Sequence, residues 1–279
     1  NQIDITISRI SPNISIACFL LGKMHLGLTD TESAGFYDKI FSQFLSSLLT
    51  AKSFARNLRR DQIRFDANIE LFYLHPKRYT PKENPFELLK INQGEPYIIM
   101  RFVSWDAYHD KGLSGFSDKN KIKAVEAFSK YAKVFITSEK ELPSKLDPYK
   151  IQIPPEKMHD VLAHAKLFFG ESATMASESA VLGTPAIYVD KNGRGYTDEE
   201  EEYGLVFNFS TDESNQLKAI NKGIELLKNP NLRDEMKSNR HNFLNTKIDA
   251  TNFLLWFIEN YPKSKMIVKK NPDYQYNFK

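Results

Sequence analysis

The chain has 279 residues but only one cysteine, Cys18, which lies in an apolar run. A single cysteine excludes a disulfide framework and favours a reducing compartment, so we expect a cytoplasmic protein. The sequence also lacks an apolar segment long enough to span a bilayer. Its start, Asn1-Gln2-Ile3-Asp4, is not a signal peptide, and it does not begin with Met.

Other absences narrow the classes of function. The sequence contains no Gly-x-x-x-x-Gly-Lys-Ser/Thr phosphate loop, no Cys-x-x-Cys, no His-Glu-x-x-His and no repeat. A net charge of +3, spread evenly, does not indicate a nucleic-acid partner. His159 and His164 are five residues apart, which does not place two ligands on one helical face, and Asp106 with His109 is too small a set for a metal. We therefore predict neither metal nor cofactor.

The overall composition is that of an ordinary soluble protein. Apolar and charged residues make up 41% and 26% of the chain, and the length suits one large or two moderate domains. Prolines and charges are concentrated between residues 75 and 96, which marks a domain boundary. We predict a first domain with its linker over residues 1–93 and a second domain over 94–248. A C-terminal helix and tail follow over 249–279, and the tail is expected to be extended or disordered.

The first domain begins with a pattern of strand, helix and strand over Ile3–Ile7, Asn13–Leu21 and Met24–Leu28. The second strand leads into a loop that contains Asp30 and Glu32. Ligand-binding groups collect beyond the carboxyl ends of parallel strands, so these two acids are candidates for chemistry. Acids that cap a helix or a turn look identical in sequence, and this alternative stays open.

Further along, apolar residues at helical spacing predict an amphipathic helix over Phe36–Leu49. In the second domain, a strand over Tyr97–Val103 runs into an aromatic loop. Arg101 or Lys111 could offset the charge of a phosphate there, and His109 could donate a hydrogen bond to it. Alternatively, Arg101 pairs with a nearby acid and His109 is an exposed loop residue.

The stretch Lys166–Asp190, KLFFGESATMASESAVLGTPAIYVD, organises the second domain. It predicts a strand, a turn, a helix, a second turn and a second strand. Gly170 ends the first strand, while Gly183 suits the left-handed end of a helix and Pro185 prevents its continuation.

The start of this helix is lined with hydroxyl groups. Ser172 or Thr174 can cap it, and its partial positive charge and free N–H groups suit a diphosphate. Glu178, one turn beyond Thr174, could accept hydrogen bonds from a ribose diol. After the second strand, Arg194 lies in a glycine-containing loop and is a candidate phosphate contact. An ordinary capped helix in a βαβ unit is the alternative.

The segment FGESATMASESAVLGTPAIYV resembles the donor-binding helix of GT-B glycosyltransferases and of hydrolysing UDP-GlcNAc 2-epimerases. In those families a Ser/Thr/Gly-rich turn holds the nucleotide diphosphate and a glutamate one turn later binds the ribose. By position, Ser172 and Thr174 match the diphosphate residues, Glu178 matches the ribose glutamate, and Leu182–Pro185 matches the exit turn. One departure is Glu171, which stands where these families often have a second glycine; a glutamate there is awkward unless it points away.

Three further motifs resemble a little-characterised GT-B-like family that is described only as a domain of unknown function: Asp30-Thr31-Glu32, Tyr73-Leu74-His75-Pro76, and Arg101 to His109 in Arg-x-x-x-Trp-x-Ala-x-His. The resemblance implies two Rossmann-like α/β/α domains that face each other across a cleft. Residues 1–93 are short for a complete first domain and begin on a strand. We therefore expect one or more βα units to precede Asn1.

The resemblance implies an enzyme that transfers sugar from a nucleotide diphosphate sugar, with UDP favoured, in surface polysaccharide or glycolipid synthesis. Because there is no Asp-x-Asp stretch, it also implies a metal-independent mechanism. The implied partners are the nucleotide sugar and a saccharide or glycolipid acceptor, which is compatible with peripheral membrane association. The candidate residues are Asp30, Glu32 and His109 for catalysis, and Arg101, Lys111, Ser172, Thr174, Glu178 and Arg194 for substrate binding.

Two other functions remain open at this stage. A hydrolysing UDP-GlcNAc 2-epimerase needs acids that remove and return a proton at the sugar. A nucleotide-sugar-binding protein without catalytic activity is the third reading, because a fold alone does not confer chemistry. The scarcity of other carboxylates in the first domain favours transfer over epimerisation.

Overall fold

A computed structural model describes residues 3–32, 35–104 and 115–279. The chain divides into two compact units, each described by itself below. The first unit comprises Asn1–His75, Arg194–Tyr196 and Thr246–Lys279, and the second comprises Pro76–Gly193 and Thr197–Asn245. The units divide after His75, where the proline-rich and charged stretch of residues 75–96 begins. The sequence assigned this linker, up to residue 93, to the first domain, whereas it groups with the second unit. The chain re-enters the first unit at Thr246 instead of residue 249.

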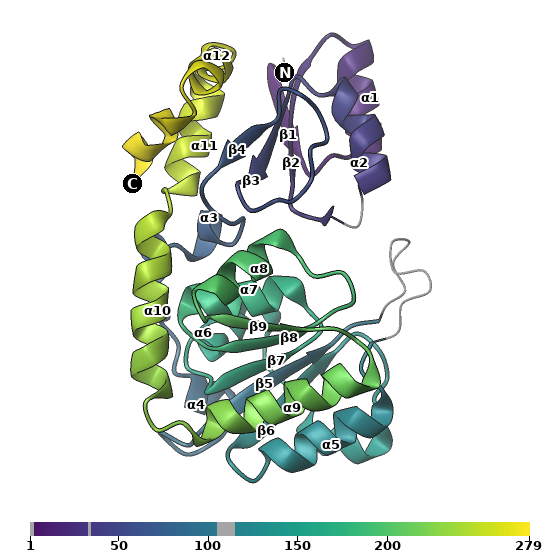
Figure 1. Cartoon of the computed structure of the whole chain (residues 1–279), viewed down its shortest axis with the longest axis vertical. Helices are drawn as coiled ribbons and strands as arrows, with labels where there is room; N and C mark the ends of the chain where they lie inside the picture. Colours follow the sequence, from purple (N-terminus) through teal and green to yellow (C-terminus); the bar gives the residue numbers. More distant parts are fainter. Residues whose placement is uncertain (1–2, 33–34, 105–114) are drawn as a thin grey trace. The chain divides into compact units, whose positions relative to one another are not determined.

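The first unit contains a parallel sheet of four strands in the order β1-β2-β3-β4 within the described residues (Figure 1). Its strands are β1 (Ile5–Ser8), β2 (Met24–Thr29), β3 (Ser47–Ala51) and β4 (Ile63–Phe65). Its helices are α1 (Pro12–Leu20), α2 (Gly35–Phe41), η2 (Ser42–Phe44), α3 (Leu71–Leu74), α11 (Ala250–Glu259), α12 (Lys263–Lys270) and η6 (Pro272–Phe278).

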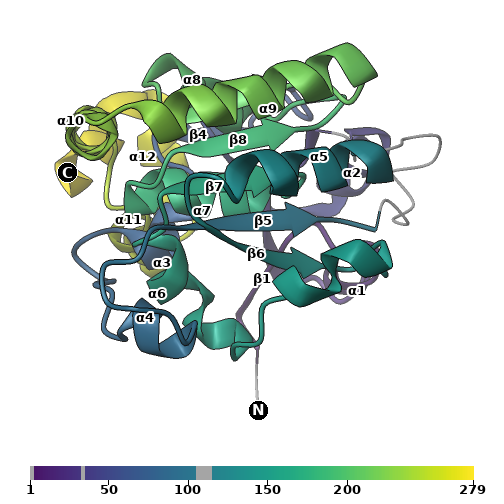
Figure 2. The same cartoon turned by 90° about the horizontal axis from the view of Figure 1, so that it is seen from below.

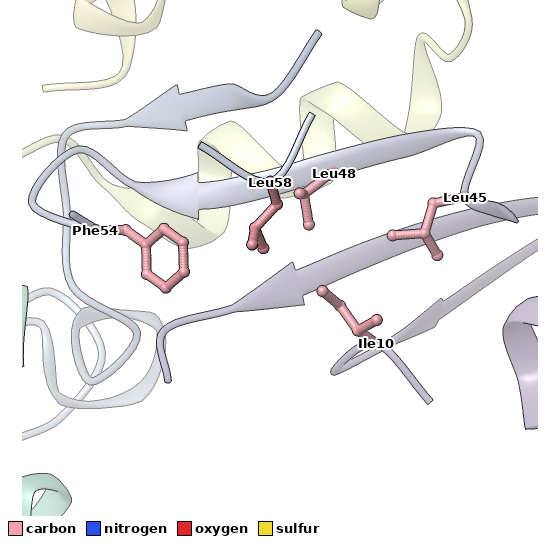
Figure 3. Close-up of a cluster of buried hydrophobic side chains, with 5 residues drawn as sticks. All are labelled: Ile10, Leu45, Leu48, Phe54 and Leu58. Carbon is pink, nitrogen blue, oxygen red and sulfur yellow. The ribbon is translucent and has the colours of Figure 1, made fainter. Parts of the chain in front are cut away.

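Side chains on the two faces of β3 pack against different helices. On one face, a cluster of buried apolar side chains is joined by Phe41 of α2; Figure 3 shows its members, Ile10, Leu45, Leu48, Phe54 and Leu58. Because side chains alternate along a strand, Ser47 points to the other face. There its hydroxyl donates to that of Tyr261, between α11 and α12, at 3.2 Å. The C-terminal helices therefore belong to the first unit.

The predicted helix over Phe36–Leu49 is wrong in its second half. The helix α2 ends at Phe41, and strand β3 begins at Ser47. Every residue of β3 is buried. A strand covered on both faces is a continuous run without the alternation of a half-exposed strand, so periodicity alone does not separate it from a buried helix.

The tail is folded, contrary to the sequence prediction. The rings of Trp256 and Tyr274 stack with their centroids 4.8 Å apart. The side chain of Gln275 accepts the backbone N–H of Asp66 at 2.7 Å, and the hydroxyl of Tyr276 donates to the Asp66 carboxylate at 2.8 Å. These contacts join η6 to the chain just after β4. These contacts are individual pairs of aromatic or polar side chains. They produce no periodic pattern in the sequence from which a folded tail could be predicted.

Helix α1 is apolar on most of its surface but buries only Ser15 and Cys18. Phe19, Leu20 and Leu21 at its end remain 60%, 76% and 72% exposed. The adjoining strand β1 lies at the edge of the first sheet. The βα units expected before Asn1 stay a prediction.

The second unit contains a parallel sheet of five strands in the order β6-β5-β7-β8-β9 within the described residues. Its strands are β5 (Tyr97–Phe102), β6 (Lys133–Ser138), β7 (Leu167–Gly170), β8 (Ala186–Val189) and β9 (Val206–Phe209). Its helices are α4 (Pro85–Leu88), α5 (Asp118–Phe128), η4 (Ser144–Tyr149), η5 (Pro155–Lys157), α6 (Met158–Leu162), α7 (Ala173–Leu182), α8 (Gly195–Glu202), α9 (Glu213–Lys228) and α10 (Leu232–Thr246). The outermost residues of α8 and α10 group with the first unit.

Helices cover both faces of this second sheet. Figures 1 and 2 show α5 and α9 on one face and α6 and α7 on the other. Phe128 of α5 meets Phe169 of β7 edge to face at 5.1 Å. A Cβ on Gly223 of α9 would lie 2.6 Å from the Phe128 ring, so glycine permits the close packing of α9 on α5. Two α/β units with parallel sheets confirm the predicted fold class.

Candidate functional site

The strand order of the second sheet marks one place for a ligand. From β5 the chain moves outward to β6 on one side, and it then returns to place β7 on the other side of β5. In open α/β sheets, ligands bind beyond the carboxyl ends of the strands where the order reverses in this way. Those ends carry Val103 and Ser104 after β5, and Glu171 and Ser172 after β7. The topology therefore selects the stretch that the sequence singled out.

The predicted strand, helix and strand over this stretch are confirmed as β7, α7 and β8. Ser172 caps the ten-residue α7, because its hydroxyl accepts the backbone N–H of Met175 at 3.3 Å. Thr174 does not form the cap and is exposed at the first turn. Gly183 ends the helix with φ +93°, as expected for a left-handed position. The start of α7 therefore offers N–H groups and partial positive charge at the switch point.

Gly170 is required by the close approach of β5 to β7. A Cβ at this position would lie 2.2 Å from the carbonyl oxygen of Arg101 and 2.9 Å from its nitrogen. A side chain would force the two strands apart at their carboxyl ends, where the ligand crevice of this fold opens.

Glu171 would place a negative charge beside the expected diphosphate if its side chain pointed there. The residue is 4% exposed, and its carboxylate accepts hydrogen bonds from the backbone. Its Oε2 accepts the N–H of Val103 at 3.0 Å, and its Oε1 accepts the N–H of Phe116. Glu171 therefore joins Val103, which follows β5, to Phe116, which precedes α5. The candidate residues His109 and Lys111 lie outside the described residues.

Glu178, the predicted ribose ligand, lies on α7 and is 8% exposed. Its Oε1 is 2.8 Å from Nε2 of His159, which is on α6. From the sequence, His159 was interpreted as a residue that does not bind a metal. Its contact with Glu178 was not predicted, because β7 lies between the two residues in the chain.

Arg101 pairs with a nearby acid, which is the alternative to phosphate binding that the sequence left open. Its Nη1 donates to the hydroxyl of Thr137 at 2.7 Å, and its Nη2 pairs with Glu139. The guanidinium is thus held at the carboxyl end of β5 with only 21% of its side chain exposed. Arg194 groups with the first unit and is already engaged in an interaction.

In the first unit, Asp30 follows β2 and is 7% exposed. It pairs with Arg9 and accepts the hydroxyl of Thr31 at 3.0 Å. Nearby, Thr29 donates to Asp38 at 2.8 Å, and burial raises the pKa of the Asp38 carboxyl despite this hydrogen bond and the charge of Arg9. Sequence reasoning missed Asp38 because it lies inside a predicted helix. A buried carboxyl with a shifted pKa is a common feature of functional sites.

The side chain of Glu32 accepts the first backbone N–H of a helix that is distant in sequence. Its Oε1 accepts the backbone N–H of Gly195, the first residue of α8, at 3.1 Å and that of Ala55 at 3.5 Å. Its Oε2 is shielded from solvent and, within the part of the chain that the structure describes, has no hydrogen-bond partner. A Cβ on Gly195 would lie 2.1 Å from the carbonyl oxygen of Ser53, so this contact with backbone requires glycine.

A cavity of about 550 Å³ lies at the other end of the second sheet. Its lining includes Glu95 and Lys133, whose charged groups are 3.2 Å apart, with Tyr131 and Tyr149. It borders the amino ends of β5 and β6, so it lies at the opposite end of the strands from the switch point. Over residues 3–32, 35–104 and 115–279, no group of three His, Cys, Asp or Glu side chains is placed to hold a metal. Over the same residues, no helix has the length and apolar character to cross a membrane.

Comparisons with known proteins were made by family, by sequence and by structure. No family model and no curated protein matches the chain. A Listeria monocytogenes structure assigned as a UDP-N-acetylglucosamine 2-epimerase matches with TM-score 0.64 and 16% identity, over 92% of this chain and 73% of that one. Os79 from O. sativa in complex with UDP matches with TM-score 0.58 and 12% identity, over 88% and 73%. The spinosyn forosaminyltransferase SpnP matches with TM-score 0.56 and 11% identity, over 92% and 75%.

At such identities the likeness shows the fold. The chain shares the fold of GT-B glycosyltransferases and of UDP-GlcNAc 2-epimerases, which confirms the predicted fold. The narrower resemblance to a family of unknown function stays a prediction.

Proposed function

We propose that this protein binds a nucleoside diphosphate sugar, with UDP favoured, at the start of α7. It then transfers the sugar to a saccharide or glycolipid acceptor in surface polysaccharide or glycolipid synthesis. The observation that carries the proposal is the capped N-terminus of α7 at the switch point of the second sheet, with Glu178 one turn further on. Structures of the same fold were solved with UDP and with thymidine diphosphate, which supports a nucleotide ligand.

Each part of the nucleotide has a proposed partner in this unit. The N–H groups at the start of α7, with the hydroxyls of Ser172 and Thr174, bind the diphosphate. Glu178 accepts hydrogen bonds from the ribose hydroxyls. Lys111 and Arg101 supply positive charge to the phosphates. The carboxylate of Glu171 accepts two backbone N–H groups and therefore does not face the phosphates.

Transfer forms a bond between the acceptor oxygen and the anomeric carbon while the bond from that carbon to the diphosphate oxygen breaks. The acceptor hydroxyl loses its proton to a base, and the leaving diphosphate keeps the electron pair of the broken bond. The charge that develops on the diphosphate is stabilised by the N–H groups at a helix start. As candidates for the base we keep Asp30 and Glu32, which follow β2 at its carboxyl end, and His109. We propose Arg194 as a further phosphate contact.

A second candidate is hydrolytic 2-epimerisation of UDP-GlcNAc. The match to the Listeria structure, with TM-score 0.64, favours it. The carboxyls of Asp30 and Asp38, both near Arg9, supply more acids in the first unit than the sequence indicated.

One experiment separates the functions. The protein is incubated with UDP-GlcNAc, with and without a mixture of saccharide and glycolipid acceptors, and the products are analysed. Transfer predicts UDP and a glycosylated product only when an acceptor is present. Epimerisation predicts ManNAc and UDP without any acceptor. Binding of UDP without turnover in either case would leave a nucleotide-sugar-binding protein, and failure to bind UDP or UDP-GlcNAc would contradict the proposal.

A further inference from the structure

The proposed ribose ligand Glu178 is held by a second side chain. Nε2 of His159 lies 2.8 Å from Oε1 of Glu178. The side chains of His159 and Glu178 are 30% and 11% exposed, so the pair lies at the border between interior and solvent. We infer that His159 is a positioning residue that fixes the Glu178 carboxylate for a ribose diol. This inference rests on the proposed nucleotide site.

The hydrogen-bonding chemistry gives the direction of this contact. An ionised carboxylate can only accept hydrogen bonds, so Nε2 of His159 carries the proton and donates it to Oε1 of Glu178. Each carboxylate oxygen has two lone pairs, so the hydrogen bond from His159 occupies one acceptor position of the Glu178 carboxylate. His159 therefore orients the carboxylate.

The imidazole of His159 is itself held in place. Its ring meets that of Tyr79 edge to face, with centroids 5.9 Å apart and planes at 78°. The Tyr79 hydroxyl donates to Oδ1 of Asp160 at 3.0 Å, and the same oxygen accepts the backbone N–H of Lys82 at 2.7 Å. Burial and the neighbouring Asp160 carboxylate raise the pKa of Tyr79, so its hydroxyl keeps its proton and remains a donor.

These contacts form a chain of fixed groups within the second unit. It runs from the backbone near Lys82 through Asp160, Tyr79 and His159 to Glu178. A glutamate that is already oriented loses less conformational entropy when a ligand binds, so pre-orientation increases affinity. The benefit is specific to the part of the ligand that Glu178 contacts, and this specificity separates positioning from general support of the fold.

The test measures binding of two ligands to four proteins by calorimetry. The ligands are UDP and 2′,3′-dideoxy-UDP, which lacks the ribose diol. The proteins are the wild type, His159→Ala, His159→Gln and the control His164→Ala. His164 is exposed and follows the same helix, α6. Glutamine keeps an N–H donor at a similar reach, whereas alanine removes it.

We expect His159→Ala to bind UDP about tenfold more weakly than the wild type, in the range for loss of a hydrogen bond to a charged group. His159→Gln should recover most of this loss, and His164→Ala should match the wild type. All four proteins should bind 2′,3′-dideoxy-UDP with nearly equal affinity, because the diol that Glu178 contacts is absent.

Three results would overturn the inference. If His159→Ala weakens both ligands equally, or leaves UDP affinity unchanged, the positioning role fails while the nucleotide site stands. If the wild type binds neither UDP nor 2′,3′-dideoxy-UDP, the proposed function fails together with the inference. Thermal unfolding of each variant checks its fold, and His159→Gln provides the answer should His159→Ala not fold.

Discussion

The carboxylate of Glu171 should stabilise the second unit measurably, and Glu171→Gln tests this. The side chain is 4% exposed and accepts two backbone N–H groups, from Val103 and Phe116. Hydrogen bonds to a charged group contribute about 1.5–3 kcal/mol each. Glutamine keeps one acceptor oxygen but turns an NH2 group toward the other backbone donor. We therefore expect the free energy of unfolding to fall by about 2–3 kcal/mol.

The assay is urea denaturation followed by circular dichroism, with UDP affinity measured on the same proteins. Glu126 on α5 is exposed, so Glu126→Gln is a matched control and should stay within about 0.5 kcal/mol of the wild type. Because Glu171 and Val103 follow β7 and β5 at the switch point where UDP is proposed to bind, Glu171→Gln should also weaken UDP binding. A Glu171→Gln protein as stable as the control would refute the view that this carboxylate stabilises the second unit through Val103 and Phe116.

Three further predictions concern the two units. Glu178→Ala should weaken UDP binding about tenfold in calorimetry while the melting temperature is retained; unchanged affinity would remove the ribose role. Glu32→Gln should abolish turnover of the nucleotide sugar but leave UDP affinity intact, and normal kcat in this variant would leave Glu32 as a helix cap only. Burial acts to raise the pKa of Asp61, but hydrogen bonds from Lys265 and Arg59 outweigh it and lower that pKa from 3.8 to about 2. The stabilisation by Asp61 is therefore present above pH 4 and lost as the pH falls toward 2. Denaturation at pH 5 and at pH 2.5 should show a smaller decrease in stability for Asp61→Asn than for the wild type, and equal decreases would contradict this assignment.

The sequence predicted the region around α7 well because the residues that begin and end its strands and helix act through local conformation. Gly170, Ser172, Gly183 and Pro185 each have a conformational or capping reason to stand where they do, and all four fall at element ends. The same local reasoning failed over Phe36–Leu49, where a strand covered on both faces has no alternation to reveal it.

Contacts between distant parts of the chain could not be predicted in this way. The pairing of His159 with Glu178 and the anchoring of Phe116 by Glu171 depend on how α6, α7 and β5 come together. The folding of the tail likewise depends on Asp66, which lies far away in the sequence. The residue types indicated which side chains are able to bind a ligand or act in catalysis. Only the tertiary structure shows which of these side chains already bind a neighbouring residue.

The central claim is that the start of α7 is the site of a nucleoside diphosphate. A crystal structure of the protein with UDP tests it most directly. The account predicts the diphosphate against the N–H groups that follow Ser172 and the ribose hydroxyls within hydrogen-bond distance of Glu178. UDP bound elsewhere would contradict it, and the cavity beside Glu95 and Lys133 at the amino ends of β5 and β6 is the place to examine first.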